Sequence, residues 1–410
     1  MNLAIVSVGA LAFAVVISCV SSVNVGVLAI ALAWLVGVYL GGLPVNTVMG
    51  GFPSQLFLTL TGVTLLFALA QSNGTLERIT RHAVAICRGN RGLIPVMFFL
   101  LGAGLSSMGP GNIATAALIA PLAMSTAVRS QIPLFLMAIM VGNGANAGAL
   151  SPFAPTGIIV NGLMARNQLP GLELQTYLYN LAAHSVVAFS GYALFGGLKL
   201  FGTGSAEAAD DGPVKAFEAR HWFTIAVIAT LILSVIFANI NVGMGAFLGA
   251  AILVLSRTAE DGEAIKRMPW RVIVMVCGVT VLIALVERAQ GIELLVSMVA
   301  KVASARTVTF VAALLVGIVS VYSSTSGVVL PAFLPMVPGL TAALPGASAI
   351  AIASSMNIGG HLVDVSPLST IGALCLAGAP ADESRALFNK LLAWGLSMAL
   401  VGATLCFLIF

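Results

Sequence analysis

Two clusters of hydroxyl, amide and glycine residues interrupt long apolar stretches of the sequence. Residues 106–112 have the sequence Ser-Ser-Met-Gly-Pro-Gly-Asn, and residues 322–327 have the sequence Tyr-Ser-Ser-Thr-Ser-Gly. Irregular backbone at membrane depth survives only where protein or a wet cavity satisfies its N–H and C=O groups. Helix N-termini at such breaks can bind an anion, and loose carbonyl oxygens can ligate a cation. The clusters therefore predict a binding site for a small anion and a coupling cation.

Each cluster is followed by a second polar interruption. Residues 148–155 break the apolar segment 132–166, and residues 357–369 break the segment 347–380. The two interruptions predict a broken helix in each half of the chain. No Arg or Lys lies in any of the breaks, so we expect helix dipoles, hydroxyls, Asn112 and bound cations to neutralise the anion.

His361 and Asp364 form an unusual ionisable pair in the second broken segment. An ionisable residue at membrane depth costs at least ~2.5–3.5 kcal/mol to insert, so its presence indicates a function. We expect Asp364 to bind the coupling ion, as a sodium ligand or a proton carrier, with His361 modulating its affinity. The alternative is that the loop reaches an aqueous vestibule and Asp364 only caps the following segment.

Helical hairpins must hold the two clusters at their tips. Apolar arms 93–105 and 113–127 flank the first tip, and arms 308–321 and 328–340 flank the second. An arm of about 15 residues spans about 22 Å, which is less than the ~30 Å hydrocarbon core. We therefore predict two re-entrant hairpins, at about 93–127 and 308–340, with tips that face each other.

The composition indicates a protein dissolved in lipid. Of its 410 residues 59% are hydrophobic and 8% charged, and the mean hydropathy is +1.07. A water-soluble globule of this length needs more polar side chains, so we predict a multi-pass inner-membrane protein. The net charge of +4 is small and the basic residues lie in short loops, which argues against nucleic-acid binding. The hydrophobic segment 3–20 lacks a basic flank and is predicted to be a membrane helix, not a cleaved signal.

The sequence repeats itself at an offset of about 215 residues. Gly-Val-Thr-Leu-Leu at 62–66 recurs as Gly-Val-Thr-Val-Leu at 278–282, and Ser-Pro at 151–152 recurs at 366–367. An amphipathic stripe follows each copy of the first motif, after Gly74 and after Gly291, and predicts a helix in the membrane interface. We expect an N-terminal repeat at 1–201, a polar linker at 202–220 and a C-terminal repeat at 221–410.

The basic residues give the two repeats opposite orientations. Arg78, Arg81, Arg88 and Arg91 follow the segment 54–71, whereas Arg257, Lys266, Arg267 and Arg271 precede or begin its counterpart 271–287. Because basic loops stay in the cytoplasm, the first segment should end there and the second should begin there. The predicted fold is an all-α polytopic membrane protein with two inverted-topology repeats, an arrangement typical of transporters.

This order of hairpin, broken helix and span resembles the ion-transporter superfamily, specifically the divalent-anion/sodium symporter fold. Residues 111–117, Gly-Asn-Ile-Ala-Thr-Ala-Ala, followed by Pro121, are similar to that family's tip signature Ser-Asn-Thr-Ala-Thr-Ala-Ala and its proline. The nearest branch consists of the shorter malonate/dicarboxylate carriers of the MatC type. The resemblance implies a homodimer with scaffold and transport regions and an elevator motion.

By resemblance, the substrate site includes residues of both tips and both broken helices. These residues are Asn112, Thr115, Ser151, Pro152, Thr156, Ser324, Thr325, Ser326, Ser366 and Pro367. The residues expected to bind the coupling ion, Na⁺ or H⁺, are Ser107, Gly111, Asn112, Asn146, Ser323, Asn357, His361 and Asp364. Gly111 and Ile113 replace the signature's serine and threonine, and the second tip lacks an asparagine, which leaves the substrate and the sodium stoichiometry open.

The predicted function is secondary transport of a small carboxylate, such as malonate or malate, coupled to Na⁺ or H⁺, with no other cofactor. The expected partners are the small organic anion, the lipid bilayer and a second copy of the chain. Alternatives are the membrane subunit of a binding-protein-dependent carrier and an inorganic-ion exchanger. An intramembrane enzyme is disfavoured because no HExxH or GxSxG motif is present and His82, His184 and His221 are expected near polar ends.

Overall fold

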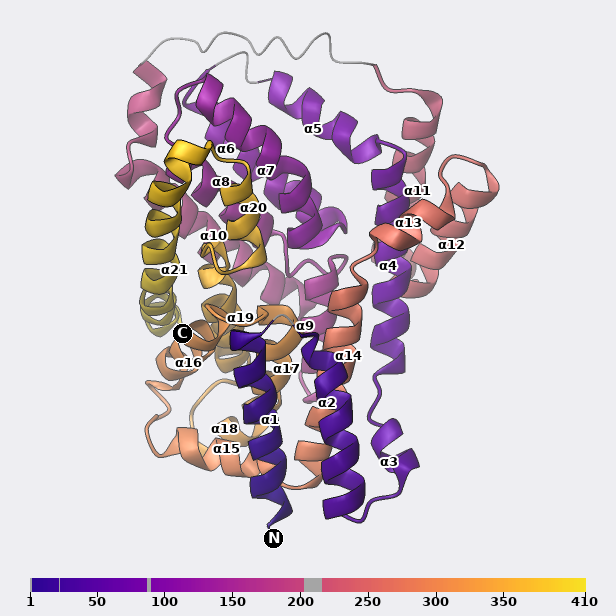
Figure 1. Cartoon of the computed structure of the whole chain (residues 1–410), viewed down its shortest axis with the longest axis vertical. Helices are drawn as coiled ribbons and strands as arrows, with labels where there is room; N and C mark the ends of the chain where they lie inside the picture. The colour runs from indigo at the N-terminus through magenta and orange to yellow at the C-terminus, as the bar shows by residue number, and fades with distance from the viewer. Residues whose placement is uncertain (1, 22, 87–89, 203–215) are drawn as a thin grey trace.

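The computed structural model describes residues 2–21, 23–86, 90–202 and 216–410, and these residues form helices and connecting turns with no β-strand (Figure 1). The helices are α1 (Leu3–Val20), α2 (Val25–Trp34), α3 (Val45–Met49), α4 (Ser54–Ser72), α5 (Thr75–Ala85), α6 (Leu93–Met108), α7 (Gly111–Arg129), α8 (Leu134–Ala147), α9 (Pro155–Arg166), α10 (Glu173–Leu194), α11 (Ala219–Ala238), α12 (Val242–Leu255), α13 (Asp261–Arg267), α14 (Trp270–Arg288), α15 (Gly291–Ala300), α16 (Val308–Ser320), α17 (Leu330–Phe333), α18 (Val337–Ala343), α19 (Ala349–Leu362), α20 (Thr370–Ala377) and α21 (Ala381–Ile409). Short π or 3₁₀ segments cover Leu35–Leu40, Gly197–Gly202, Thr325–Val329, Leu334–Met336 and Val363–Val365. Within the described residues, 8 helices are long and apolar enough to cross a membrane, which confirms a multi-pass membrane protein.

The inverted repeat is confirmed element by element. Ser54 begins α4 and Trp270 begins α14, an offset of 216 residues, and α3, α5, α8 and α9 have α13, α15, α19 and α20 as their counterparts. The predicted amphipathic helices α5 and α15 lie across opposite ends of the molecule, α5 at the top and α15 at the bottom of Figure 1. The division of the chain at 202–220 stays a prediction, because 203–215 lies outside the described residues, as does Arg88.

Close glycine contacts explain why the Gly-Val-Thr motif occurs twice. Helix α14 packs on α2, and a Cβ at Gly278 would lie 2.1 Å from the carbonyl oxygen of Gly26. Helix α4 packs on α12 in the same way, and a Cβ at Gly62 would lie 2.5 Å from the carbonyl oxygen of Gly243. Small residues let helix backbones approach this closely in a membrane. The repeated motif therefore marks a packing position in each repeat.

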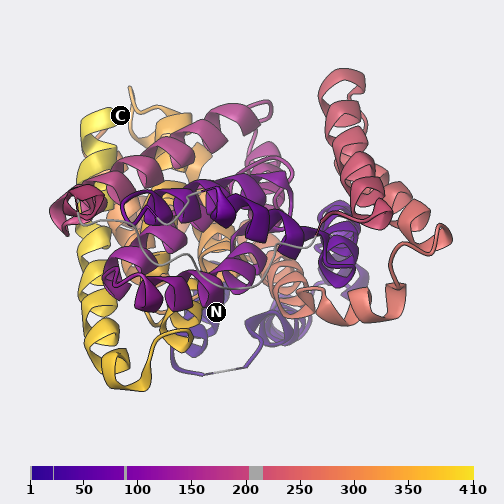
Figure 2. The ribbon, with the colours of Figure 1, turned by 90° about the horizontal axis from the view of Figure 1, so that it is seen from above.

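The helices group into two bodies. Helices α6–α10 and α16–α21, here called the core body, pack mainly on one another, with α8 and α19 at the centre. Helices α1–α5 and α11–α15, here called the frame, are built around the α2–α14 and α4–α12 contacts. In the view from above, α11 and α12 stand at one side and the yellow α21 at the other (Figure 2). The core body and the frame meet mainly through α4 with α9, α14 with 325–333, and α15 with α18.

Both predicted hairpins are present as pairs of helical arms, but their second arms are longer than predicted. Helix α7 begins at the tip itself and has 19 residues with Pro121 inside it, which is long enough to span a membrane. The second hairpin returns over 325–343, and Pro331, Pro335 and Pro338 divide that arm into π, α and 3₁₀ turns. A proline has no N–H to donate, so it interrupts the regular hydrogen-bonding pattern. Arm length alone therefore does not separate a re-entrant arm from a span.

The second broken helix is interrupted later than the predicted start at residue 357. Helix α19 continues to Leu362, and the irregular segment is 363–369. Asn357 and His361 therefore lie inside a regular helix, where Nδ1 of His361 is 2.8 Å from the carbonyl oxygen of Asn357. The predicted start was wrong because hydroxyl, proline and glycine residues collect in 357–369 and indicate a break, whereas close packing of Gly359 on α16 accounts for glycine inside the helix.

Candidate functional site

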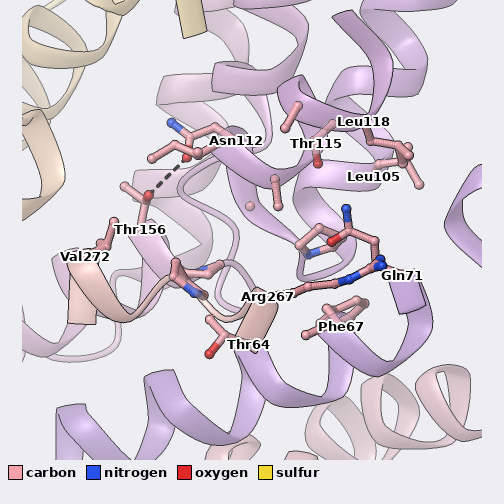
Figure 3. Close-up of a pocket in the computed structure, with 18 of the residues that line it drawn as sticks. Thr64, Phe67, Gln71, Leu105, Asn112, Thr115, Leu118, Thr156, Arg267 and Val272 are labelled. Atoms are coloured by element: carbon pink, nitrogen blue, oxygen red, sulfur yellow. Dashed lines mark hydrogen bonds between the residues drawn. The ribbon is translucent and has the colours of Figure 1, made fainter. Parts of the chain in front are cut away.

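Two adjoining cavities lie where the hairpin tips meet the frame. The first, here called the α4 cavity, has a volume of about 340 Å³ and lies between α4, the first tip and the end of α13 (Figure 3). The second, the α14 cavity, has a volume of about 530 Å³ and lies between α14, the second tip and the loop before α20. Both cavities are lined by Asn112, Ile113, Val272 and Ser326. The structure thus brings the two tips together, as the sequence predicted.

The first tip needs two glycines in the left-handed region. Gly109 has φ 143° and Gly111 has φ 77°, and a Cβ at Gly109 would lie 1.8 Å from the Phe67 ring. A Cβ at Gly111 would lie 2.8 Å from Cδ of Pro155 at the start of α9. Gly111 replaces the signature serine at a position where an L side chain is strained. Gly111 therefore sets the backbone conformation of the tip at the first residue of α7.

Asn112 links the first tip to the first broken helix. Its Nδ2 donates to Oδ1 of Asn146 at 2.8 Å, and its Oδ1 accepts from the Thr156 hydroxyl at 3.4 Å. Asn146 donates in turn to the carbonyl oxygen of His361 in the other repeat, at 3.3 Å. The Asn112 side chain is 7% exposed, so these bonds fix its amide at the junction of the two cavities.

Thr115 adds an unpaired polar atom to the α4 cavity. Its side chain is 1% exposed, and its hydroxyl oxygen has no hydrogen-bond partner. Leaving a buried hydroxyl unpaired costs about 1–3 kcal/mol, so this group is a ready donor for a molecule in the cavity. Figure 3 shows Thr115 and Asn112 on the same helix, with Thr156 joined to Asn112 by a hydrogen bond and Arg267 on the opposite side of the cavity.

The second tip is bound to the second broken helix by a carboxylate. The Thr325 hydroxyl donates to Oδ1 of Asp364 at 2.8 Å, and the Ser324 hydroxyl accepts from the N–H of Gly327 at 3.2 Å. The backbone carbonyl of Asp364 accepts from the Ser369 hydroxyl. Asp364 is half-buried and lines the α14 cavity, so its carboxylate can be reached by an ion in that cavity.

The second tip also contacts the frame. The hydroxyl oxygens of Ser323 and Ser18, at the end of α1, are 2.6 Å apart. Ser18 and Ser323 both line the α14 cavity. This hydrogen bond connects the core body to the frame beside the candidate site.

Gly327 stands in the second tip at the position that corresponds to Asn112, 215 residues later. The end of the Met275 side chain on α14 lies beside it, with Cε 2.1 Å from where a Cβ would be. The polar groups of the second half come instead from Thr325, Ser326 and Asp364.

Two arginines of the frame, which are not among the predicted site residues, also line the cavities. Arg267, at the end of α13, lines the α4 cavity, and Arg271, at the start of α14, lines the α14 cavity. Figure 3 shows the Arg267 side chain extending past Phe67 toward Gln71. Both arginines were interpreted only as topology signals. The two arginines lie four residues apart, on either side of Pro269 at the start of the repeated span. That position was the signal that could have identified them as site residues.

The structure places only part of the predicted site on the cavity walls. The residues that line the two cavities are Gly111, Asn112, Thr115, Thr156, Ser323, Ser324, Thr325, Ser326 and Asp364. The predicted residues that line neither are Ser107, Asn146, Ser151, Pro152, Asn357, His361, Ser366 and Pro367. Ser151 donates to the carbonyl oxygen of Ser107 at 2.6 Å, and Pro152 lines a separate cavity between α4 and α9.

His184 is not at a polar end, so the prediction for this residue was wrong. It is completely buried in α10, and its Nδ1 is 2.9 Å from Oδ1 of Asn143. Asn180, one turn earlier, donates to the carbonyl oxygen of Asn146 at 2.8 Å. Through Asn180, helix α10 therefore holds the backbone of Asn146, whose side chain bonds to Asn112. The spacing of four residues between Asn180 and His184 on one face of α10 was the signal that could have found them.

Comparison with known families agrees with this geometry. Residues 1–149 match the family model of the dicarboxylate carrier protein MatC N-terminus, and residues 232–410 match the citrate transporter family model. No protein of curated function matches the sequence. Among solved structures, the YdaH transporter of Alcanivorax borkumensis, described as having an unusual topology, has a similar fold with a TM-score of 0.58. It is 17% identical, and the match covers 88% of this chain and 87% of that chain. Both matched family models describe transporters, which favours a transporter over an enzyme.

Proposed function

We propose that this chain, whose two ends match the MatC N-terminus and citrate transporter family models, moves a small dicarboxylate, such as malonate or malate, together with Na⁺ or H⁺. The observation that carries this proposal is the junction of the two cavities at Asn112 and Ser326. An anion at the junction would meet the Asn112 amide, the Thr115 and Ser326 hydroxyls and the N-terminus of α7. Hydrogen bonds to a charged group contribute about 1.5–3 kcal/mol each.

Asp364 gives the proposed coupling a physical basis. Its carboxylate lines the same cavity as Ser326 and would repel an anionic substrate. A cation or proton bound at Asp364 removes that repulsion, so substrate and ion favour each other's binding. The side-chain hydroxyls and loose carbonyls of the second tip are oxygen donors of the kind that hard cations prefer.

The proposed motion is an elevator, with the core body moving against the frame. The substrate would be held by the core body through Asn112, Thr115 and Ser326, while the frame supplies the opposite walls of both cavities. We further propose that the chain works as a homodimer in the inner membrane, with the α5 and α13 end in the cytoplasm, where the basic loops place it.

Uptake by the purified chain in liposomes tests the function. We expect saturable uptake of a radiolabelled C3 or C4 dicarboxylate, driven by a sodium or proton gradient and needing no soluble binding protein. Asn112→Ala should reduce uptake by 10-fold or more, since it removes the amide that two hydrogen bonds hold at the junction. Asn46→Ala on α3, whose side chain is exposed away from both cavities, is the matched control.

Three results would contradict the proposal. One is transport of inorganic ions or neutral solutes alone. Another is uptake that appears only when a soluble binding protein is added, which would favour the alternative carrier class. The third is wild-type uptake by folded Asn112→Ala protein.

A further inference from the structure

We propose that Arg267 and Arg271 bind the substrate's carboxylates from one side of the membrane only, in the state in which the site faces α13. The inference rests on the proposed function and deepens it, because it assigns two recognition residues and a sidedness. A dicarboxylate at the cavity junction would have one guanidinium in each adjoining cavity. Guanidinium groups match carboxylates with two parallel hydrogen bonds, which suits a substrate with two anionic ends.

Helix α13 is fixed so that Arg267 points at the α4 cavity. Ala264 and Met268, on the same helical face, are buried against α4, and Nε1 of Trp270 donates to the carbonyl oxygen of Ile265 at 2.8 Å. Arg267 lies on the edge of that face, three residues after Ala264. These contacts hold a seven-residue helix at the cavity entrance.

The neighbouring Lys266 is directed elsewhere. Its Nζ lies 2.8 Å from Oε1 of Glu263, and both side chains are exposed. The hydrogen bond and the positive charge of Lys266 lower the pKa of Glu263. Lys266 does not line either cavity. Lys266 and Arg267 therefore carry the same charge on adjacent residues, but only Arg267 lines one of the two cavities, so the two positions can be compared by substitution.

The other end of the molecule lacks this pair. The counterparts of Arg267 and Arg271, 216 residues earlier, are Gly51 and Gln55. Gln55 lines a cavity of about 540 Å³ beside α4 and α9, to which neither hairpin tip contributes a residue. Arg166 and Glu173 also line that cavity, and their charges have opposite sign. The two faces therefore offer an anion different electrostatic environments.

Because both arginines belong to the frame, their contact with the substrate depends on the position of the core body. Asn112, Thr115 and Ser326 travel with the substrate, whereas Arg267 and Arg271 stay behind. A ligand shifts an equilibrium by its differential affinity for the two states. Bound dicarboxylate should therefore favour the α13-facing state, and substrate should bind more tightly from that side.

Initial-rate transport from each face tests the inference. Everted membrane vesicles present the α13 face to the medium, and intact cells present the opposite face. For the transported dicarboxylate, Arg267→Gln and Arg271→Gln should each raise KM about 10-fold in everted vesicles and less than 2-fold in cells, as expected for loss of one charge-assisted pair. Lys266→Gln, which removes the same charge one residue away, should leave both KM values unchanged.

Each outcome decides a separate point. Absence of carboxylate transport by the wild-type chain from either face overturns the proposed function, and the inference falls with it. Wild-type transport with unchanged KM in both variants, or with equal changes on both faces, overturns the inference alone. An equal effect of Lys266→Gln would show that only the general charge of α13 matters. Should Arg271→Gln not fold, Arg267→Gln on the exposed end of α13 carries the test.

Discussion

Replacement of Asp364 by asparagine should separate substrate binding from ion coupling. The Asp364 carboxylate accepts one hydrogen bond from Thr325, at 2.8 Å, and otherwise faces the α14 cavity. Asparagine has the same shape, and its Oδ1 can still accept from Thr325. The change therefore removes the charge and leaves the contact between the second tip and the second broken helix in place.

The substitution is expected to have a small effect on folding stability and a large effect on ion binding. A hydrogen bond to a charged group contributes about 1.5–3 kcal/mol and one to a neutral group about 0.5–1.5 kcal/mol, so folding should lose about 1 kcal/mol. A monovalent cation about 4 Å from the carboxylate gains at most about 4 kcal/mol at an effective dielectric constant near 20. Loss of that attraction weakens ion binding by up to about 1000-fold. Coupling should thus fail in a protein that still folds.

The assay is thermal stability with substrate, together with uptake at varied sodium and pH. We expect Asp364→Asn to keep substrate-induced stabilisation and to lose the dependence of uptake on sodium or pH. Asp382→Asn, at the exposed start of α21, is the matched control and should behave as wild type. A folded Asp364→Asn variant with the wild-type ion dependence refutes the assignment and moves coupling to the backbone carbonyls of the breaks.

Two further predictions concern packing and motion. Gly278→Ala should destabilise the detergent-solubilised protein by about 1–3 kcal/mol, because its Cβ would lie 2.1 Å from the Gly26 backbone. Gly9→Ala, with nothing within 4 Å of the added Cβ, is the control and should change the stability by no more than about 0.5 kcal/mol. Equal thermal-denaturation midpoints for the two variants would contradict the packing argument. In a Cys19→Ser background, the pair Ser18→Cys and Ser323→Cys should form a disulfide that stops transport until it is reduced, since the native hydroxyls are 2.6 Å apart. Unimpaired turnover of the cross-linked protein would exclude movement of the second tip against α1.

The fold followed from the sequence because its signals are strong and local. Long apolar runs, the repeated Gly-Val-Thr motif and the distribution of arginines gave the spans, the repeat and its inversion, and the helix boundaries agree within a few residues for α1, α4 and α14. Signals inside the core body were weaker. The glycines and hydroxyl residues of 357–369 indicate a break from residue 357, but helix α19 continues to Leu362 because glycine at 359 admits the close approach of α16.

The site was harder to predict because several of its residues act from separate elements. Asn112, Thr115 and Thr325 were found from their positions in the tips, and they line the cavities. Ser151 and Ser366 come from equally polar motifs, yet the repeated Ser-Pro elements serve local turns, since a Cβ at Gly157 or Gly372 would meet the serine carbonyl at 2.0 Å. Arg267 and Arg271 were overlooked because one basic residue can both set topology and face a cavity. Sequence alone does not show which way its side chain points.

The two repeats share their packing positions and differ in their chemistry. Gly62 and Gly278 make equivalent helix contacts, but Asn112 corresponds to Gly327, and Asp364 corresponds to Ala149, which is completely buried and lines neither cavity. Equivalent packing lets two halves exchange shapes about a common site. Under the proposed function, the first tip would offer neutral donors to the anion, while Asp364, which accepts a hydrogen bond from Thr325 of the second tip, would offer its carboxylate to the cation.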